Sequence, residues 1–200
     1  MIHAVVNAFN EEMMLPGCLE SVCGKVDKIV VVDGAYEQFP HQHHASTDGT
    51  LAIAWCYGAR IVKAPERAWK SEIEKRNRFF VGNEGDWYLQ IDADERLLGE
   101  LPTLDNDVTH YAFLMRHDSF DGWIRRLYQH LPGLRYEGAH SALWWKGGIL
   151  RNEDAEKIAP EQAQLLHLGH LRNVERQRAR LEYKAWQGPY ERPYRDRHSL

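Results

Sequence analysis

The chain has 200 residues, of which 44% are apolar and 27% charged, and its formal net charge is -4. These values predict one globular domain with a hydrophobic core, and they exclude a disordered, collagen-like or coiled-coil protein. The small negative charge gives no electrostatic reason to expect binding to nucleic acid or to an anionic membrane, because both favour a basic surface.

The three cysteines, Cys18, Cys23 and Cys56, form no C-x-x-C pair. This argues against a disulfide framework or a zinc ribbon and favours a reducing compartment. No apolar segment approaches the ~20 residues that span a bilayer, and the start MIHAVVNAFNEE lacks the features of a signal peptide. We therefore expect a cytoplasmic protein with no transmembrane segment.

The first half of the sequence alternates between strand patterns and helix patterns. Apolar and β-branched runs predict strands at residues 2–6, 28–32, 60–63 and 86–91. Apolar residues at helical spacing predict helices at residues 11–23 and 69–81, and another that is capped by residues 46–48 and ended by Gly58. Strands separated by helices indicate an α/β domain with a mainly parallel sheet.

The second half has a less regular pattern. Strands are predicted near residues 111–116, 125–129 and 164–168, and a helix at residues 174–186. The tail beyond it is not helical in pattern. No linker or internal repeat divides the chain, so we expect a single domain.

Two carboxylates follow the fourth predicted strand, in the segment QIDADERL. Side chains two residues apart in an extended chain point to the same side, so Asp92 and Asp94 converge at the carboxyl end of this strand. Open α/β sheets bind ligands at that edge, and carboxylate oxygens suit Mg2+ or Mn2+ held together with phosphates. The alternative is a solvated acidic turn that caps Arg96, since the D-x-D pattern is short and common.

Five motifs place this pair in a wider context. NAFNEE, VVVDG, STDGT, W-x-x-E-x-x-K-R-N and DWYLQIDADE occur in the order found in family 2 glycosyltransferases. The chain resembles that family over about its first hundred residues, and most closely the branch that modifies lipopolysaccharide cores. The resemblance implies a GT-A (Rossmann-like) fold, a mainly parallel sheet flanked by helices with a small mixed C-terminal part. We expect a nucleotide-binding half (residues 1–100), an acceptor-side half (101–186) and a tail (187–200).

The resemblance also implies roles for individual residues. The loop after the first strand, including Ala8, Asn10 and Glu12, would face the nucleotide, with Glu12 as a helix-start carboxylate or a base contact. Asp33 would accept a hydrogen bond from the nucleobase imide. Asp92 would contact the ribose or the metal ion, and Asp94 would bind the divalent ion that bridges the diphosphate.

Polar residues on the predicted third helix give a separate physical indication. Arg76 and Asn77 fall on the same side as Trp69 and Ile73, where unpaired polar groups are costly. We expect Arg76 to meet the nucleotide or an acidic loop, and Asn77 to hold backbone near the site. The alternative is an internal salt bridge to a residue such as Asp33 or Glu12.

The segment LLHLGHLR offers another metal ligand. Its H-x-G pattern resembles the histidine that follows the core sheet in the family, which implies that His167 is a third ligand of the metal ion or the diphosphate. An imidazole ligand favours Mn2+ over Mg2+. The alternative is a hydrogen-bonded core histidine.

The catalytic base is less clearly indicated. Relatives show G-x-x-H-E, but this chain has YEGAHSAL, in which His140 matches and Ser141 replaces the acid. Glu137, His140, Asp121 and Asp118 are the candidates.

Aromatic residues that are candidates to stack on an acceptor sugar, or alternatively to pack in the core, are Trp123, Trp144 and Trp145. Arginines of the C-terminal region, among them Arg172 and Arg180, either approach the diphosphate or an anionic acceptor or form a solvated helix face, and we favour the solvated face.

The expected function is metal-dependent, inverting glycosyl transfer of the hexosyltransferase type, from a nucleotide-sugar donor to a hydroxyl acceptor. We favour a UDP-sugar as the donor; the acceptor is a glycan, a lipid-linked group or another hydroxyl compound, and a homodimer is compatible with the sequence. One rival is a nucleotidyltransferase of related fold, which would need a Gly-rich, Arg-containing loop where NAFNEE stands. The other rival is a non-catalytic module that binds a nucleotide sugar.

The segment DGAYEQFPHQHHASTDGT contains His41, His43 and His44. In the family the motif runs on as D-G-S-x-D-x-T, whereas here AYEQFPHQHHA separates its two halves, so the histidines lie in an insertion. We expect this insertion to be a lid beside the nucleotide pocket that contacts the donor or the acceptor, with Pro40 stiffening it. A dedicated metal site is the less favoured alternative.

Overall fold

The computed structural model describes residues 1–82, 85–117, 121–138, 142–172 and 174–187. At its centre is a large sheet with the strand order β3-β2-β1-β4-β7-β6-β12-β5, and β11 pairs with β6. The parallel strands at one side of this sheet are β1 (Ile2–Ala8), β2 (Lys28–Asp33), β3 (Arg60–Val62) and β4 (Trp87–Gln90). The other strands are β5 (Glu95–Gly99), β6 (His110–Arg116), β7 (Asp121–Gln129), β11 (Glu156–Lys157) and β12 (Ala163–His167).

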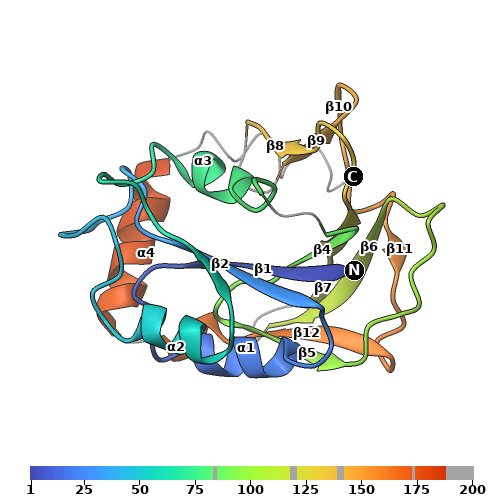
Figure 1. Ribbon diagram of the computed structural model, residues 1–200, viewed down its shortest axis with the longest axis horizontal. Coiled ribbons are helices and arrows are strands. Elements are labelled where there is room, and N and C mark those ends of the chain that lie inside the picture. Colours follow the sequence, from blue (N-terminus) through green and yellow to red (C-terminus); the bar gives the residue numbers. More distant parts are fainter. Residues whose placement is uncertain (83–84, 118–120, 139–141, 173, 188–200) are drawn as a thin grey trace.

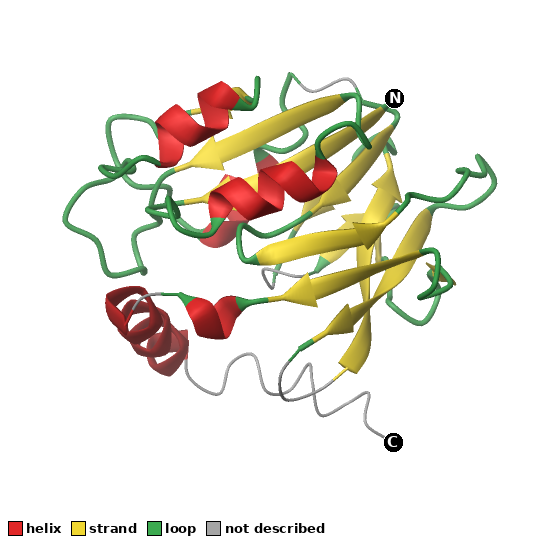
Figure 2. Ribbon diagram, turned by 90° about the horizontal axis from the view of Figure 1, so that it is seen from below, coloured by secondary structure: helices red, strands yellow, loops and turns green. Residues whose placement is uncertain are grey.

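Both faces of the sheet are covered (Figures 1 and 2). Helices α1 (Leu15–Val22) and α2 (Thr50–Cys56) lie on one face. The other face carries α3 (Glu72–Asn77) and a small sheet of β8 (Arg135–Tyr136), β9 (Leu143–Trp145) and β10 (Gly148–Ile149). A 3-10 turn, η1 (Gly169–Leu171), and helix α4 (Val174–Gln187) follow β12. The predicted α/β architecture with a mainly parallel sheet flanked by helices is confirmed. The C-terminal part is not a separate mixed unit, because most of its strands join the large sheet and the small sheet of β8, β9 and β10 is antiparallel.

Strand β2 shows why the sequence pattern was informative. Ile29 and Val31 belong to the core under α1 and α2, whereas Val30 and Val32 belong to the core under α3. Alternate side chains of a strand point to opposite faces, so a strand that is apolar at every position must be covered on both sides.

Two helices are shorter than predicted. The helix predicted from residue 69 begins at Glu72, because the Ser71 side chain accepts a hydrogen bond from the Glu74 N–H and caps it. Trp69 instead pairs with Tyr36 in a β-bridge, which holds it in an extended conformation. The helix predicted from residue 11 begins at Leu15, with a proline in its first turn.

In the second half, the strands predicted near residues 111–116, 125–129 and 164–168 are confirmed, with β7 beginning earlier than expected. Strands β5, β8, β9, β10 and β11 were not predicted from the sequence. Most of these are very short, so they carry too few residues for an alternating pattern to be recognised. Helix α4 is confirmed, and the tail from residue 188 lies outside the described residues. No helix in the described ranges combines the length and apolar character that a membrane crossing requires.

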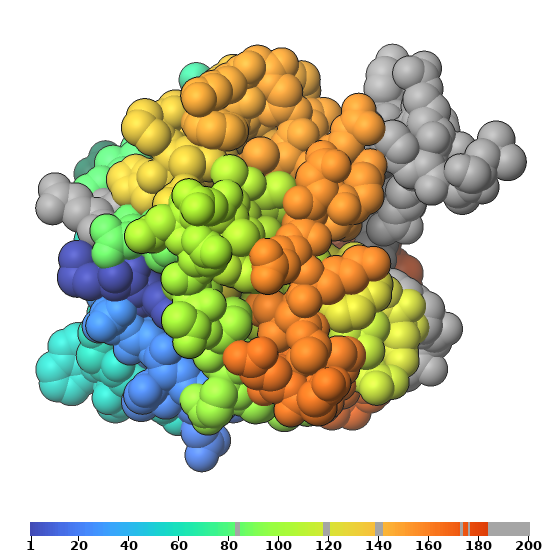
Figure 3. All heavy atoms as spheres, turned by 90° about the vertical axis from the view of Figure 1, so that its right-hand side faces the viewer, coloured from blue at the N-terminus to red at the C-terminus, as the bar shows by residue number. Residues whose placement is uncertain are grey.

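The parallel strands define two ends of the molecule. Strands β1, β2, β3 and β4 all end on the side where α4 stands (Figure 1). The opposite end is covered by the yellow-green segment around residues 101–110 and the orange segment around residues 150–162 (Figure 3). Ligands of open α/β sheets bind at the carboxyl ends of the strands. We therefore expect a binding site at the edge beside α4.

Candidate active site

Asp94 is the centre of the polar groups at this edge. Its side chain is 2% exposed, and its Oδ2 atom lies 3.2 Å from Nε2 of His167, 2.8 Å from a terminal nitrogen of Arg172 and 3.4 Å from one of Arg180. Its backbone carbonyl accepts a hydrogen bond of 2.7 Å from the N–H of Leu168, which joins the start of β5 to the end of β12. Burial acts to raise the pKa of Asp94, but the hydrogen bond with His167 and the charge of Arg172 outweigh it and lower the pKa to about 2. Asp94 is therefore an anion at neutral pH.

Gly169 leaves space beside this carboxylate. A Cβ atom at this position would lie 2.6 Å from Cε1 of His167 and 2.8 Å from Oδ2 of Asp94. No side chain fits there without displacing one of these groups. The end of β12 therefore places the His167 imidazole beside Asp94 and, two residues later, leaves room beside the carboxylate.

Asp94 and His167 fit a divalent ion as a pair of ligands. A hard oxygen and an imidazole nitrogen suit Mn2+, with further positions open to ligand oxygens and water. Within the described residues, no group of three or more His, Cys, Asp or Glu side chains is placed to hold a metal ion. The predicted ligand set of Asp92, Asp94 and His167 is therefore not assembled, although two of its members are.

Asp92 is held by arginines instead. Its Oδ2 accepts a hydrogen bond of 3.0 Å from Arg126, and its Oδ1 lies 3.6 Å from Arg76. Burial acts to raise the pKa of Asp92, but the charges of Arg126 and Arg76 outweigh it and hold the pKa below its usual range. The side chain is still 28% exposed, so a carboxylate with a defined orientation faces the edge.

Glu95 and Arg126 complete this network, and the sequence analysis missed both. The buried Glu95 pairs with Arg126, and its Oε2 accepts a hydrogen bond of 2.9 Å from the N–H of Asp92. Burial raises the pKa of Glu95 to about 7, against the lowering effect of Arg126. Glu95 was visible in the D-A-D-E motif, but nothing local to Arg126 on β7 indicates a partner across the sheet.

The roles predicted for α3 are resolved in part. Arg76 pairs with Glu72 at 2.8 Å and approaches Asp92, so it forms an internal salt bridge with partners other than the expected Asp33 or Glu12. Asn77 holds backbone, as predicted: its amide donates to the Tyr136 carbonyl at 3.0 Å and accepts from the Tyr136 N–H at 2.8 Å. The small sheet that begins at β8 is thereby attached to α3.

A buried lysine joins the ends of the first two strands. Nζ of Lys75 donates to the carbonyl of Ala8 at 2.8 Å and to the carbonyl of Gly34 at 2.6 Å. Ala8 itself is buried at the end of β1, and it offers this carbonyl rather than a side chain. Lys75 stands in the predicted W-x-x-E-x-x-K-R-N motif, but the position of its amine required the tertiary structure.

The loop after β1 is tied to the start of α2. The side chain of Asn10 accepts a hydrogen bond of 2.9 Å from the N–H of Thr47, and the carboxylate of Glu12 accepts one of 2.8 Å from the N–H of Gly49. Glu12 thus holds the residue before α2, rather than the start of the helix that follows it in the chain, which begins at Leu15.

Asp33 is fully buried at the end of β2. Its Oδ1 accepts a hydrogen bond of 2.6 Å from the Ser46 hydroxyl, and its Oδ2 accepts one of 3.2 Å from the Ser46 N–H. Ser46 follows the insertion. The two halves of the D-G-S-x-D-x-T motif, which the insertion separates in the sequence, are therefore in contact in the structure. A ligand reaches Asp33 only if the segment above it moves.

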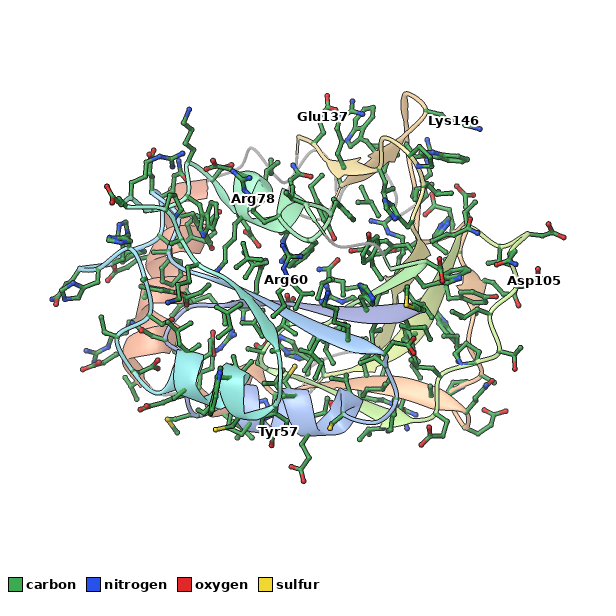
Figure 4. All side chains as sticks on the ribbon, in the orientation of Figure 1. Tyr57, Arg60, Arg78, Asp105, Glu137 and Lys146 are labelled. Atoms are coloured by element: carbon green, nitrogen blue, oxygen red, sulfur yellow. The ribbon has the colours of Figure 1, made fainter. Side chains whose placement is uncertain are left out.

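The candidate catalytic bases do not gather around Asp94. Glu137 is 50% exposed, pairs with Arg135 at 2.5 Å and points outward from the small sheet (Figure 4). Asp121 pairs with Arg116 at 2.5 Å, where β6 and β7 adjoin. His140 and Asp118 lie outside the described residues.

A histidine that was not predicted lies close to the Asp94 centre. The ring of His117, which follows β6, stacks on the ring of His167 at a centroid distance of 4.7 Å. Strands β6 and β12 are parallel neighbours, so their ends bring these two rings together. The HDSF segment carried no signal of this contact, because it depends on pairing between distant strands.

The remaining aromatic and histidine candidates have structural contacts. Lys157 lies over the ring of Trp123, the indole N–H of Trp144 donates to the carbonyl of Glu137, and Trp145 packs against the core under α3. The insertion histidines, His41, His43 and His44, are exposed and belong to no metal-binding group within the described residues.

Arg172 lies beside Asp94 rather than on a solvated helix face. The prediction that the C-terminal arginines form a solvated helix face is therefore wrong for this residue. It bridges two acids, since its guanidinium also pairs with Glu11 at 2.8 Å. Burial acts to lower the pKa of Arg172, but the charges of Asp94 and Glu11 outweigh it and raise the pKa.

Sequence comparison places the chain near glycosyltransferases. No protein-family model matches it. An uncharacterized glycosyltransferase of Rickettsia felis is 33% identical over 112 residues, which cover 56% of this chain and 34% of that protein. A TPR repeat-containing protein of Synechococcus elongatus is 29% identical over 145 residues, covering 67% of this chain and 33% of that protein. The chain spans about a third of the length of these curated relatives.

Solved structures show partial similarity. Glucosyl-3-phosphoglycerate synthase from Mycobacterium tuberculosis, in complex with Mn2+, uridine diphosphate and glucosyl-3-phosphoglycerate, is 28% identical with a TM-score of 0.37, over 48% of this chain and 34% of that chain. S. aureus TarS 1–349 in complex with UDP is 25% identical with a TM-score of 0.40, over 50% of this chain and 29% of that chain. These TM-scores are too low to carry either ligand set over to this chain.

Proposed function

We propose that this chain is a metal-dependent glycosyltransferase domain that moves a sugar from a nucleotide-diphosphate donor, a UDP-sugar, to a hydroxyl acceptor. The observation that carries the proposal is the convergence of Asp94, His167 and Arg172 at the carboxyl edge of the sheet. An acid, an imidazole and a guanidinium together suit a metal ion and a diphosphate. The similarity in sequence to a glycosyltransferase over more than half of the chain supports it.

Asp94 and His167 would hold the metal ion, Mn2+ in preference to Mg2+. Such an ion stabilises the negative charge on the diphosphate when the bond to the sugar breaks. Arg172 is held by Glu11 at the same place, so its guanidinium is positioned to bind a phosphate oxygen. Gly169 leaves the space that these ligands need.

Asp92 would bind the ribose rather than the metal ion. Arg126 and Arg76 hold its carboxylate in one orientation and keep it ionised, so it can accept hydrogen bonds from hydroxyl groups. Asp33 would accept a hydrogen bond from the nucleobase after the segment containing Ser46 has moved. The loop that contains Asn10 and Glu12 would contribute the wall of this nucleotide pocket.

Inversion would require a base on the acceptor side of the sugar. Asp121, His140 and Glu137 remain the candidates for it, and the acceptor half is proposed to be residues 101–186. An acceptor of the lipopolysaccharide-core type, as well as a lipid-linked or other hydroxyl acceptor, stays a prediction from the resemblance. So do the cytoplasmic location and a homodimer.

A second candidate is a module that binds a nucleotide sugar without reaction. The pairing of Asp94 with two arginines favours it, because these cations compensate the carboxylate without a metal ion.

A thermal-shift panel of nucleoside diphosphates, with and without Mn2+, tests the binding proposal. Ligand at about 100 times its Kd stabilises the native state by roughly 2.7 kcal/mol, which raises the Tm of a domain of this size by roughly 5–10 °C. We expect UDP with Mn2+ to give the largest shift. If no nucleoside diphosphate shifts the Tm, the proposal fails.

Hydrolysis of UDP-sugars with Mn2+ then separates the enzyme from the binding module. The wild-type protein should release the sugar slowly, Asp94→Asn should not, and Asp105→Asn, at the opposite end of the molecule, should behave as wild type (Figure 4). Binding of UDP without any release by the wild type would favour the binding module.

A further inference from the structure

The insertion and helix α4 are joined by an aromatic cluster. The ring of Tyr183, on α4, lies 5.0 Å from the ring of Tyr36 and 5.9 Å from that of Phe39. Phe39 in turn meets Phe9, which directly follows β1, edge to face at 6.2 Å. Figures 1 and 2 both show the loop that contains residues 36–44 beside α4.

This cluster covers the edge of the sheet where β1 and β2 end. Phe9 and Phe39 are each only 6% exposed, and they share a core with Ala35 and Ala68. The N–H of Ala35 donates to the carbonyl of His44 at 2.9 Å, so the two ends of the insertion meet next to Asp33. The aromatic rings therefore lie at the nucleobase end of the proposed donor site.

The middle of α4 reaches the diphosphate end of that site. Arg180, one turn before Tyr183, approaches Asp94, and Arg172 just before the helix pairs with the same carboxylate. Asp94 thus has two guanidinium groups as partners where the proposed metal ion would bind. With a metal ion and a diphosphate bound, the Asp94 carboxylate would hold the ion, and Arg172 and Arg180 would bind phosphate oxygens instead of Asp94. No buried charge would be left unpaired.

We propose that the insertion (residues 35–45), Arg172 and α4 form one donor cap, in which Phe39 and Tyr183 contact the nucleobase while Arg172 and Arg180 contact the diphosphate. This inference rests on the proposed function and adds to it the residues that determine donor affinity at each end. Aromatic rings stack on nucleobases, and one planar guanidinium group can donate two hydrogen bonds to phosphate oxygens. Because Tyr183 and Arg180 stand on one helix, the two ends of the cap close together.

Calorimetric titration with two probes in the presence of Mn2+ tests the cap. UDP has both a base and a diphosphate, whereas inorganic pyrophosphate has only the second. We expect Phe39→Ala and Tyr183→Ala to weaken UDP binding roughly tenfold and to leave pyrophosphate binding unchanged, because only base stacking is lost. Arg180→Gln should weaken the binding of both probes roughly tenfold, because it removes a charged hydrogen bond.

Matched controls come from exposed residues. Arg178→Gln, on the same helix, and Trp55→Ala, an exposed aromatic on α2, should bind both probes as the wild type does. Phe39→Leu keeps an apolar side chain in the cluster, so it separates lost stacking from lost folding. It should weaken UDP binding while retaining the wild-type Tm to within a few degrees.

The outcomes distinguish the two proposals. If the wild type binds neither probe with Mn2+, the proposed function fails, and the cap with it. If the wild type binds UDP but the Phe39, Tyr183 and Arg180 variants bind it equally well, only the cap is overturned. Tighter UDP binding by Phe39→Ala would also overturn it, since the cluster would then only obstruct the base site.

Discussion

Nε2 of His167 lies 3.2 Å from Oδ2 of Asp94, although the two residues come from opposite halves of the chain. The contact arises because β12 lies between β6 and β5 and pairs antiparallel with β5, with His167 opposite Glu95. The end of the last strand is thereby placed beside the D-A-D-E turn. A metal site at this edge depends on that strand order.

Replacement of His167 by alanine should weaken Mn2+ binding. Loss of an outer-shell partner alone costs roughly 10- to 100-fold in metal affinity, so loss of one of two direct ligands should cost at least that. Titration of Mn2+ in the presence of UDP measures the effect. His170→Ala, on the exposed part of η1, is the matched control, and equal Mn2+ affinity of the two variants would contradict the assignment.

Replacement of Gly169 by alanine should affect both stability and metal binding. The new methyl group would lie 2.6 Å from Cε1 of His167 and 2.8 Å from Oδ2 of Asp94, so these side chains, the proposed metal ligands, must move. Overpacking of this kind costs roughly 1–3 kcal/mol, measurable by urea unfolding. In the control Gly148→Ala the nearest atom is 3.9 Å away, and we expect little change. A Gly169→Ala protein with wild-type Mn2+ affinity would show that the space beside Asp94 is not used.

Replacement of Arg126 by methionine should destabilise the protein by about 3–5 kcal/mol. The variant leaves the buried Glu95 without its ion-pair partner and removes a hydrogen bond from Asp92. Without Arg126, the carboxylates of Glu95 and Asp92 both lose a cationic partner. The double variant that also carries Glu95→Gln has only one of these carboxylates, so it should regain part of the lost free energy of unfolding. Urea unfolding of the two single variants and the double variant measures the coupling energy between Arg126 and Glu95. If the free-energy changes of the single variants simply add up to that of the double variant, the two residues do not interact.

The contribution of His110 to stability should decrease as the pH falls below about 6.5. Burial lowers the pKa of His110 from its usual 6.5 and outweighs the raising effect of the Arg151 carbonyl, which lies 2.9 Å from its Nε2. The unfolded chain therefore takes up a proton at a higher pH than the folded chain does. Its contribution to stability is fully present above pH 6.5 and is lost as the pH falls through the lowered pKa.

The test is the Tm of wild type and His110→Asn between pH 7.5 and roughly pH 5. The variant should lose less Tm over this interval than the wild type. His43→Asn, at an exposed position of the insertion, should keep the wild-type dependence. A His110→Asn protein with the same pH dependence as wild type would show that another group is responsible.

The sequence by itself determined the local elements and the acidic strand end. The β-branched run at residues 28–32, the helical spacing after it and the D-A-D-E turn are patterns within a few consecutive residues, and chain periodicity alone converts them into strands, helices and faces. Asp94 and His167 were recognisable candidates because each stands at the end of such a pattern.

The tertiary structure alone decided which groups meet. Arg126 on β7 binds Asp92 and Glu95, Lys75 joins the ends of β1 and β2, and Arg172 rather than Asp92 lies beside Asp94 and His167. Each contact joins residues distant in the chain, and strand order and helix placement are properties of pairing and packing across the whole domain. No local pattern encodes them, so the partners that set the charge and orientation of Asp92 and Asp94 became visible only in the fold.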